Sequence, residues 1–372
     1  MTHSLTRKRS TSSLSKHESD ISDVSLREGK NAVVKSRRYE KLLALADIYM
    51  NDDGKMTTTI ECKALCQTLL NADQTVSYDS LFNDDLFERV CQRVRNKIEA
   101  RVIRDLSSLL VPFAEILYLR EATNLEHLIE TVDESWIKSI PLVQDSRSQL
   151  DFAVRLKSSA FTSDQVKKLQ LSVDDWQTTS RLMATDEIYF SFLTAEMKCD
   201  NEALNIANRQ NARSAVVAAN AIVELYRLMS RQDELNQKIL TFSISHDNEA
   251  VRMYEHYALI KRKKTLFYRH SVDKLDFTRQ NGKEKWTSYT FTRNVYDKFY
   301  SIHHERICSA VDELLNSEDF AVEFFSQQSN LDFFEQNDSQ LIMLNSQQTE
   351  SGLSSSQTSE PVFKKSKGKG KK

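Results

Sequence analysis

The chain has 372 residues, with 51 Lys and Arg against 53 Asp and Glu and a formal net charge of −2. Hydrophobic residues make up 40%, enough to bury a core in one large or two ordinary domains. The longest apolar run, 109–119, is interrupted by Glu115 and is shorter than the roughly 18 residues that a membrane span needs, so a membrane protein is excluded. The N-terminal stretch lacks the apolar centre of a secretory signal, and five sparse cysteines suit free thiols, so we expect an intracellular protein.

The charge is divided unevenly along the chain. Residues 1–38 hold nine basic and four acidic side chains, 307–363 hold ten acidic and no basic ones, and 364–372 hold six lysines. Neither end has an apolar period that would offset the entropy of ordering, so we predict disorder over 1–30 and 317–372. The basic runs at both ends are typical of nuclear-targeting or nucleic-acid-binding tails, and equally of solubilising termini.

Residues 31–140 are predicted to be a helical region that leads into the core. Only two Gly and two Pro fall within 39–335, so the sequence encodes few sharp turns. Apolar residues recur at helical spacing over 36–50, 58–71, 84–110 and 124–139. Asp52-Asp53-Gly54 is expected to end the first of these helices, and Pro112 the third.

Residues 141–316 are predicted to form an α/β core. Period-two alternation indicates strands at 149–156 and 189–198, separated by a short helix, 164–171. A long helix, 201–238, follows, and further strands are expected at 239–245, 251–257, 266–270 and 274–278, before a last helix from Thr292 to 315. The order favours a mixed β-sheet flanked by helices, in which the long helix crosses over between strands.

One strand carries a pair of residues suited to chemistry. Residues two apart in a strand share a face, so Glu196 and Lys198 project side by side. If Asp151 lies alongside, two carboxylates form a hard oxygen site suited to Mg²⁺ or Mn²⁺, which would activate water. Lys198 would then orient the nucleophile or stabilise the developing charge. The plainer interpretation is a Glu–Lys pair on a strand surface.

These residues resemble the PD-(D/E)XK nuclease superfamily in kind and in order. Leu150-Asp151 stands where the superfamily has Pro-Asp, and Glu196-Met197-Lys198 matches its E-x-K. The resemblance implies a restriction-endonuclease-like core that hydrolyses phosphodiester bonds with Mg²⁺ or Mn²⁺. Two features depart from it. Leu150 replaces the proline, and 45 residues separate Asp151 from Glu196, so residues 158–187 would be an insertion and the two strands need not be neighbours.

The same resemblance suggests two further members of the site. Gln210 lies on the helix after the E-x-K strand, where several branches carry a glutamine, and it is equally explained as a solvated helix position. A glutamate on the first core helix can complete the metal site in that superfamily. Glu99 is our candidate for it and Glu115 the alternative, although a helical glutamate among arginines is usually in surface ion pairs.

Longer stretches resemble a fungal family described only as a domain of unknown function, over roughly residues 85–315. The resemblance is carried by AEMKCDNEALNIANRQNARSAVVAANAIVELYRL, ILTFSISHDNEAVRMYEHY and KEKWTSYTFTRNVYDKFYSIHHERICSAVDEL. It implies no activity.

Residues 251–306 combine 13 basic and six acidic side chains with many aromatic ones. This composition suits a nucleic-acid partner, DNA or RNA, or equally a sheet whose aromatic face is buried. The run Lys261, Arg262, Lys263 and Lys264 is the expected phosphate contact. The sequence therefore predicts a nuclear, metal-dependent nuclease or nucleic-acid-binding protein. The alternative is a catalytically inactive nuclear module that keeps the fold and binds other proteins.

Overall fold

Seven strands of the described chain form one mixed sheet in the order β1-β7-β6-β5-β4-β3-β2. Their bounds are β1 Ile48–Tyr49, β2 Leu128–Ser135, β3 Gln149–Leu156, β4 Tyr189–Met197, β5 Ile239–His246, β6 Ala250–Lys261 and β7 Lys264–Asp276. β4 pairs with β5, and β1 with β7, in parallel, whereas the other neighbours are antiparallel. The predicted α/β fold with a mixed sheet flanked by helices is thereby confirmed.

The structure is a computed structural model that describes residues 36, 38–50, 58–120, 122–136, 139, 149–172, 182, 189–199, 203–262 and 264–314. All of these belong to one unit, Met1–Leu314. Both predicted disordered tails, Asp52-Asp53-Gly54 and Lys263 lie outside the described residues. Within the described chain, no helix combines the length and the apolar character that crossing a membrane would need.

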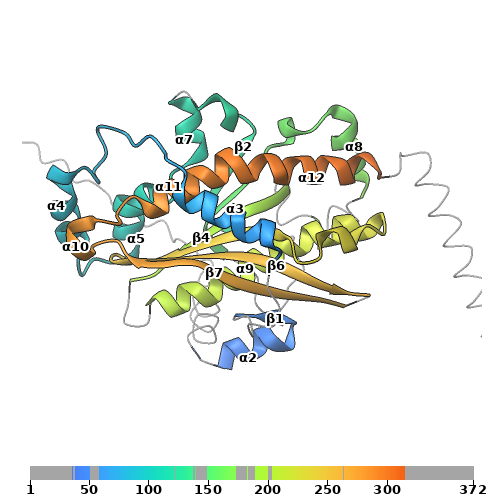
Figure 1. Cartoon of the computed structure of the whole chain (residues 1–372), viewed down its shortest axis with the longest axis horizontal. Helices are drawn as coiled ribbons and strands as arrows, with labels where there is room; N and C mark the ends of the chain where they lie inside the picture. The colour runs from blue at the N-terminus through green and yellow to red at the C-terminus, as the bar shows by residue number, and fades with distance from the viewer. Residues whose placement is uncertain are drawn as a thin grey trace, which may run out of the picture. The chain divides into compact units, whose positions relative to one another are not determined.

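Helices cover both faces of the sheet. They are α2 Arg38–Leu45, α3 Ile60–Asn71, α4 Asp84–Val94, α5 Glu99–Val102, α6 Ser108–Leu110, α7 Ala114–Leu119, α8 Ser163–Leu171, α9 Ala203–Leu228, α10 Arg279–Gly282, α11 Thr287–Asn294 and α12 Tyr300–Asp312. Figure 1 shows α11 and α12 along the upper side of the sheet and α2 along the lower side. On the upper side, Phe242 packs against Phe291 and Phe299; on the other, Thr241 Oγ1 donates to Ala215 O of α9.

The long helix α9 is the crossover that joins β4 to its parallel neighbour β5. One buried amide fixes it to both strands. Asn211 Nδ2 donates to Ile244 O at 2.9 Å, and Asn211 Oδ1 accepts from Thr194 Oγ1 at 2.5 Å. Because buried polar groups stay buried only when they are hydrogen-bonded, these contacts set the height of the helix on the sheet. The helix predicted over 201–238 is present as α9. It is shorter than predicted, because it ends at Leu228, before Ser230, whose φ of 57° is left-handed.

The predicted helix over 84–110 is interrupted. α4 ends at Val94, and Asn96 has φ 57°, a left-handed conformation that asparagine tolerates better than most residues. A new helix begins at Glu99 and passes into a π-helical turn, Ile103–Ser107. The sequence has no Gly or Pro here, so the pattern alone predicted continuity.

Three other predictions differ from the structure: one predicted helical segment is a strand, the last helical segment begins earlier than predicted, and two predicted strands are one. Residues 128–135, predicted as part of a helix, form β2, where the β-branched Ile129, Thr131 and Val132 favour a strand and β3 supplies the pairing partner. The last helical segment begins at Thr287, and Thr292 is a buried interior residue instead of its cap. The two strands expected at 266–270 and 274–278 are one strand, β7.

Most of the aromatic side chains of 251–306 lie inside the fold. Tyr254, Tyr257, Phe267, Tyr268 and Phe291 are each at most 9% exposed. Tyr257 and Tyr268 stack with ring centroids 5.8 Å apart. The five are buried, as the plainer interpretation expected, and are closed to stacking on bases. They do not form one face of the sheet, because Tyr257 and Tyr268 pack in one cluster, Phe267 and Phe291 in another, and Phe291 lies on α11.

Candidate active site

Strand pairing brings Asp151 beside Glu196. In the antiparallel pair β3–β4, Phe152 lies opposite Ala195, and continuing this register by one residue places Asp151 opposite Glu196. Directly opposed residues of an antiparallel pair point to the same face of a sheet. The 45-residue interval therefore does not separate the two strands, and both acids lie at the edge where β4 ends.

Lys198 is surrounded by three carboxylates. Its Nζ lies 2.9 Å from Glu99 Oε1, 3.4 Å from Asp151 Oδ2 and 3.9 Å from Glu196 Oε2. It also donates to Met197 O at 2.8 Å, while Met197 N donates to Asp151 Oδ2 at 2.7 Å. Four of the five residues predicted to form the catalytic site thus meet in one cluster, drawn from α5, β3 and β4.

The surroundings of Glu196 and Lys198 raise the pKa of both groups, with opposite consequences for their charge. Glu196 is 1% exposed, and its burial raises its pKa well above the usual range; the negative charge of Asp151 adds to this, whereas Lys198 and Arg213 oppose it. Burial by itself would lower the pKa of Lys198, but the three carboxylates outweigh burial and hold that pKa above its usual value. Lys198 is therefore a fixed cation, and Glu196 is the acid that most resists ionisation.

The interruption after α4 positions Glu99. Because the chain turns at Asn96, Glu99 falls in the first turn of α5 and reaches Lys198. Glu115, the alternative candidate, lies on α7, where its carboxylate is 3.8 Å from Lys157 Nζ and its backbone N–H donates to Glu130. Glu115 thus belongs to a different group of charges.

Gln210 is not joined to this cluster by a hydrogen bond. Its side-chain oxygen is buried, with no hydrogen-bond partner among the described residues. The α9 residue whose charge acts on Glu196 is Arg213, three positions later. Sequence reasoning missed Arg213, because its interaction with Glu196 depends on how α9 packs against the sheet.

His246 was also missed as a neighbour of the site, because the strand predicted over 239–245 ends one residue before it. It is the last residue of β5 and pairs with Met197 across the parallel strands. Its Nε2 is 3.1 Å from Ser107 Oγ, and burial lowers the pKa of the imidazole, which favours the neutral form. The signal was the parallel pairing itself, since the carboxyl ends of parallel strands meet at one edge.

A small cavity of about 30 Å³ opens beside the two acids. Asp151, Glu196, Ser107 and His246 line it together with apolar side chains. Glu196 Oε1 is buried and has no hydrogen-bond partner among the described residues, which is unusual for a carboxylate oxygen. Carboxylate oxygens are ligands that Mg²⁺ prefers, so the donor set of Asp151 and Glu196 suits that ion, but a cavity of about 30 Å³ has room for little more than one water molecule. No group of three or more His, Cys, Asp or Glu in the described chain forms a denser metal cluster.

The predicted phosphate contact lies far from this cavity. His246 pairs with Val251, and Lys261 is ten residues further along β6, about 33 Å at the rise of a strand. Lys261, Arg262 and Lys264 are exposed at the turn between β6 and β7, and Lys264 Nζ is 2.9 Å from Asp47 Oδ1.

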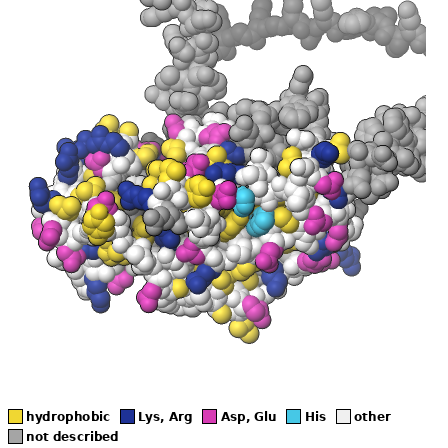
Figure 2. Space-filling model, turned by 90° about the horizontal axis from the view of Figure 1, so that it is seen from above, with side chains coloured by type: hydrophobic (Ala, Val, Ile, Leu, Met, Phe, Trp, Pro, Cys, Tyr) yellow, Lys and Arg dark blue, Asp and Glu magenta, His cyan; other side chains and the backbone are white. Residues whose placement is uncertain are grey.

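Four other exposed cations precede Glu99 closely in the sequence. We call them the α4 surface: Arg89, Arg93, Arg95 and Lys97. None of the four is joined to a carboxylate within the part of the chain that the structure describes. Figure 2 shows Lys and Arg side chains gathered at its left end, the end at which α4 and α10 lie in Figure 1.

The fold and the cluster define an α/β protein with a partly buried acidic site around one lysine, in which Glu196 is buried and Glu99 is partly exposed. A family described as a domain of unknown function, DUF7924, matches residues 86–311, more than half of the chain, and the chain belongs to this family. The match covers α5, β3, β4, α9 and β5, and so includes every residue of the cluster. No curated protein matches the chain.

We expect Glu196→Gln to change how stability depends on pH. The pKa of Glu196 is higher in the folded chain than in the unfolded one, so its burial stabilises fully only below the pKa of an exposed glutamate, and this contribution is lost as pH rises through the folded value. Glutamine cannot ionise. Relative to wild type, the variant should gain about 1 kcal/mol or more in unfolding free energy between pH 5 and pH 8 in urea titrations without metal. Glu126→Gln, at an exposed position, is the control; parallel curves for all three chains would contradict the assignment.

Proposed function

We propose that the chain is a metal-dependent nuclease of the PD-(D/E)XK type, acting on phosphodiester bonds of nucleic acid. The observation that carries this proposal is the position of Lys198 Nζ, within 2.9–3.9 Å of Glu99, Asp151 and Glu196 at one edge of the sheet. A surface ion pair would leave the carboxylates in water. Here Glu196 is 1% exposed and keeps one oxygen without a hydrogen bond among the described residues.

The order of the elements supports the same proposal. β2, β3 and β4 form an antiparallel run, α9 crosses over, and β5 joins in parallel beside β4. The helix bearing Glu99 precedes them. This is the arrangement that the resemblance to the restriction-endonuclease-like core implies, with the acid and the E-x-K residues on adjacent strands.

The residues have distinct proposed roles. Asp151 and Glu196 hold the ion, and a bound Mg²⁺ or Mn²⁺ would polarise a phosphoryl oxygen and lower the pKa of its water. Glu99, Asp151 and Met197 O accept the three N–H groups of Lys198, which hold its ammonium beside the two acids, where its positive charge would stabilise the negative charge that develops on phosphorus oxygens. Because Glu196 must lose its proton to bind a cation, ion binding should weaken as the solution is acidified. Gln210 and His246 have no assigned step.

Two surfaces are proposed for the nucleic acid. The α4 surface adjoins Glu99 in the chain, and its four unpaired cations suit a phosphate backbone. The Lys261–Lys264 turn is a second, remote surface that would engage a long duplex only. The basic runs at both ends of the chain lie outside the described residues, and nuclear localisation is part of this proposal on their composition alone.

A cleavage assay tests the proposal. Purified chain is incubated with supercoiled plasmid, single-stranded DNA and single-stranded RNA, each with Mg²⁺, Mn²⁺ or EDTA. We expect nicking or cleavage of at least one substrate with Mg²⁺ or Mn²⁺ and none with EDTA. A calorimetric Mg²⁺ titration of wild type and Glu196→Gln is run beside it. A folded chain that neither cuts nor binds the ion would refute the nuclease and favour the inactive interaction module.

A further inference from the structure

The described chain contains a second, much larger cavity, at the opposite end of β5 from the candidate active site. It is open to solvent and has a volume of about 520 Å³, within the range of small-molecule sites. Its walls come from α3, from the turn Gln232–Leu235, from the start of β5 at Ile239 and from one side of α12. His246, at the other end of β5, lines the active-site cavity, so the two cavities are about 23 Å apart along the strand.

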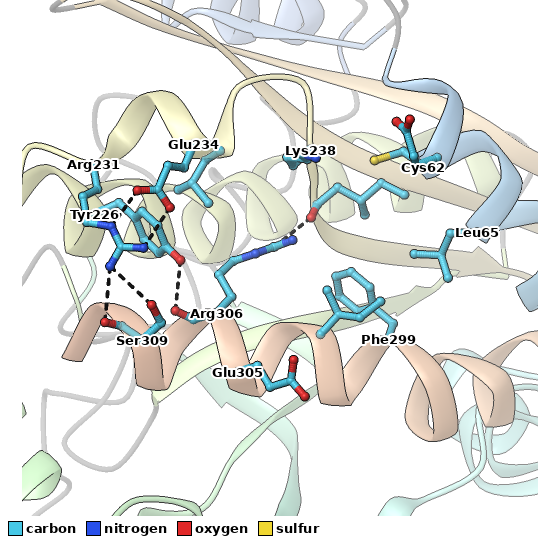
Figure 3. Close-up of a pocket in the computed structure, with 14 residues that line it drawn as sticks. Cys62, Leu65, Tyr226, Arg231, Glu234, Lys238, Phe299, Glu305, Arg306 and Ser309 are labelled. Carbon is cyan, nitrogen blue, oxygen red and sulfur yellow. Dashed lines mark hydrogen bonds and ion pairs between the residues drawn. The ribbon is translucent and has the colours of Figure 1, made fainter. Parts of the chain in front are cut away.

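Arg306 is the unusual group in this cavity. Its guanidinium is partly buried, and Nη1 donates to the backbone Ile239 O at 2.9 Å. No carboxylate pairs with it among the described residues, and burial lowers its pKa. Figure 3 shows the side chain extended across the cavity, between Tyr226 and Phe299. A guanidinium has five N–H donors. Keeping this charged group away from water without a partner anion costs free energy.

The neighbouring cation is already neutralised. Arg231 contacts Glu234 and Glu313, each at 2.6 Å, and its guanidinium lies over the Tyr226 ring. Figure 3 shows this group turned toward Ser309, at one side of the cavity. An incoming anion would therefore compete with two carboxylates for Arg231, whereas Arg306 offers its remaining donors without competition.

The rest of the wall is mixed, because Glu61, Glu305 and Lys238 line the cavity together with apolar side chains. Leu65 and Phe299 face the cavity on the side away from Arg231, next to the buried Cys62, which is 7% exposed. The site thus combines Arg306, which has no carboxylate partner among the described residues, and the exposed Lys238 with an apolar surface a few side chains long. Such a surface matches a ligand with an acidic head and an apolar body, because a purely polar ion would leave it unpaired.

We propose that this cavity binds a small amphipathic carboxylate, with the carboxylate on Arg306 and the apolar body against Leu65 and Phe299. A bidentate guanidinium–carboxylate contact supplies orientation, and the apolar contacts supply most of the affinity. The site shares no residue with the candidate active site, and it stands whether or not the chain cuts nucleic acid.

Calorimetric titration of the full chain with sodium octanoate tests the site. We expect saturable binding with a Kd below about 1 mM, and at least tenfold weaker binding of acetate, which lacks the body, and of 1-octanol, which lacks the charge. Arg306→Gln should weaken octanoate binding at least tenfold. Lys298→Gln removes one charge from an exposed position outside the cavity and should bind like wild type.

A second variant tests the site even if Arg306→Gln does not fold. Leu65→Glu places a carboxylate in the partly buried apolar wall and should also weaken octanoate binding at least tenfold, with folding checked by circular dichroism. Equal affinities for octanoate and 1-octanol would overturn the role of Arg306. Absence of saturable heat with octanoate up to about ten times the expected Kd would overturn the site itself.

Discussion

Replacing Lys198 by methionine should reduce Mg²⁺-dependent cleavage at least about 1,000-fold, if the proposed nuclease activity is present. The ammonium lies 2.9 Å from Glu99, 3.4 Å from Asp151 and 3.9 Å from Glu196, so the variant removes a positive charge that all three carboxylates share. Methionine keeps the length and apolar stem of the side chain. The loss should therefore appear in kcat, with nucleic-acid binding in Ca²⁺ or EDTA changed less than about threefold.

The ion-binding readout separates this role from a structural one. Removing a cation beside two carboxylates should leave Mg²⁺ affinity unchanged or raise it, whereas a collapsed site would lose the ion. Lys157→Met is the matched control, because Lys157 also lies near a carboxylate, 3.8 Å from Glu115, but away from the cluster. Retention of more than a tenth of the activity in Lys198→Met, with normal folding, would contradict the proposed role.

The cluster was largely predictable because its members are set by local rules. Period two placed Glu196 and Lys198 on one face of β4, and the alternation over 149–156 placed Asp151 on a strand. Neither rule says which strands are neighbours. That pairing depends on the register Phe152–Ala195, a tertiary contact between segments separated by 158–187, and so it had to come from the structure.

The parts that were missed depend on contacts distant in sequence. Residues 128–135 mix helix-favouring Leu128 and glutamates with β-branched side chains, and pairing with β3 decides between the two structures. The interruption at Asn96 has no Gly or Pro to mark it, yet it is what turns Glu99 toward Lys198. His246 and Arg213 reach the site through parallel pairing and helix docking, which no residue spacing encodes.

Charge reversal of the α4 surface should weaken nucleic-acid binding about 100-fold at 0.1 M salt. The variant is Arg89→Glu with Arg93→Glu, two exposed residues one helical turn apart on α4. Each cation that contacts a phosphate releases counterions, so the variant should also bind with a shallower dependence on salt concentration. The measurement is fluorescence anisotropy of labelled duplex and single strands in EDTA, between 0.05 and 0.2 M salt, which is about the range in which such contacts lose most of their affinity.

The matched comparison is Lys261→Glu with Arg262→Glu, which changes the net charge by the same amount at exposed positions about 30 Å from the cluster. If nucleic acid approaches the proposed cleavage site, the α4 variant must lose far more affinity for a short strand than the turn variant, because a short strand cannot span both surfaces. A larger loss in the turn variant would assign the phosphate contact to Lys261 and Arg262, as composition alone suggested. Equal, small losses in both would remove nucleic acid from the described surface and leave the buried cluster without its proposed substrate.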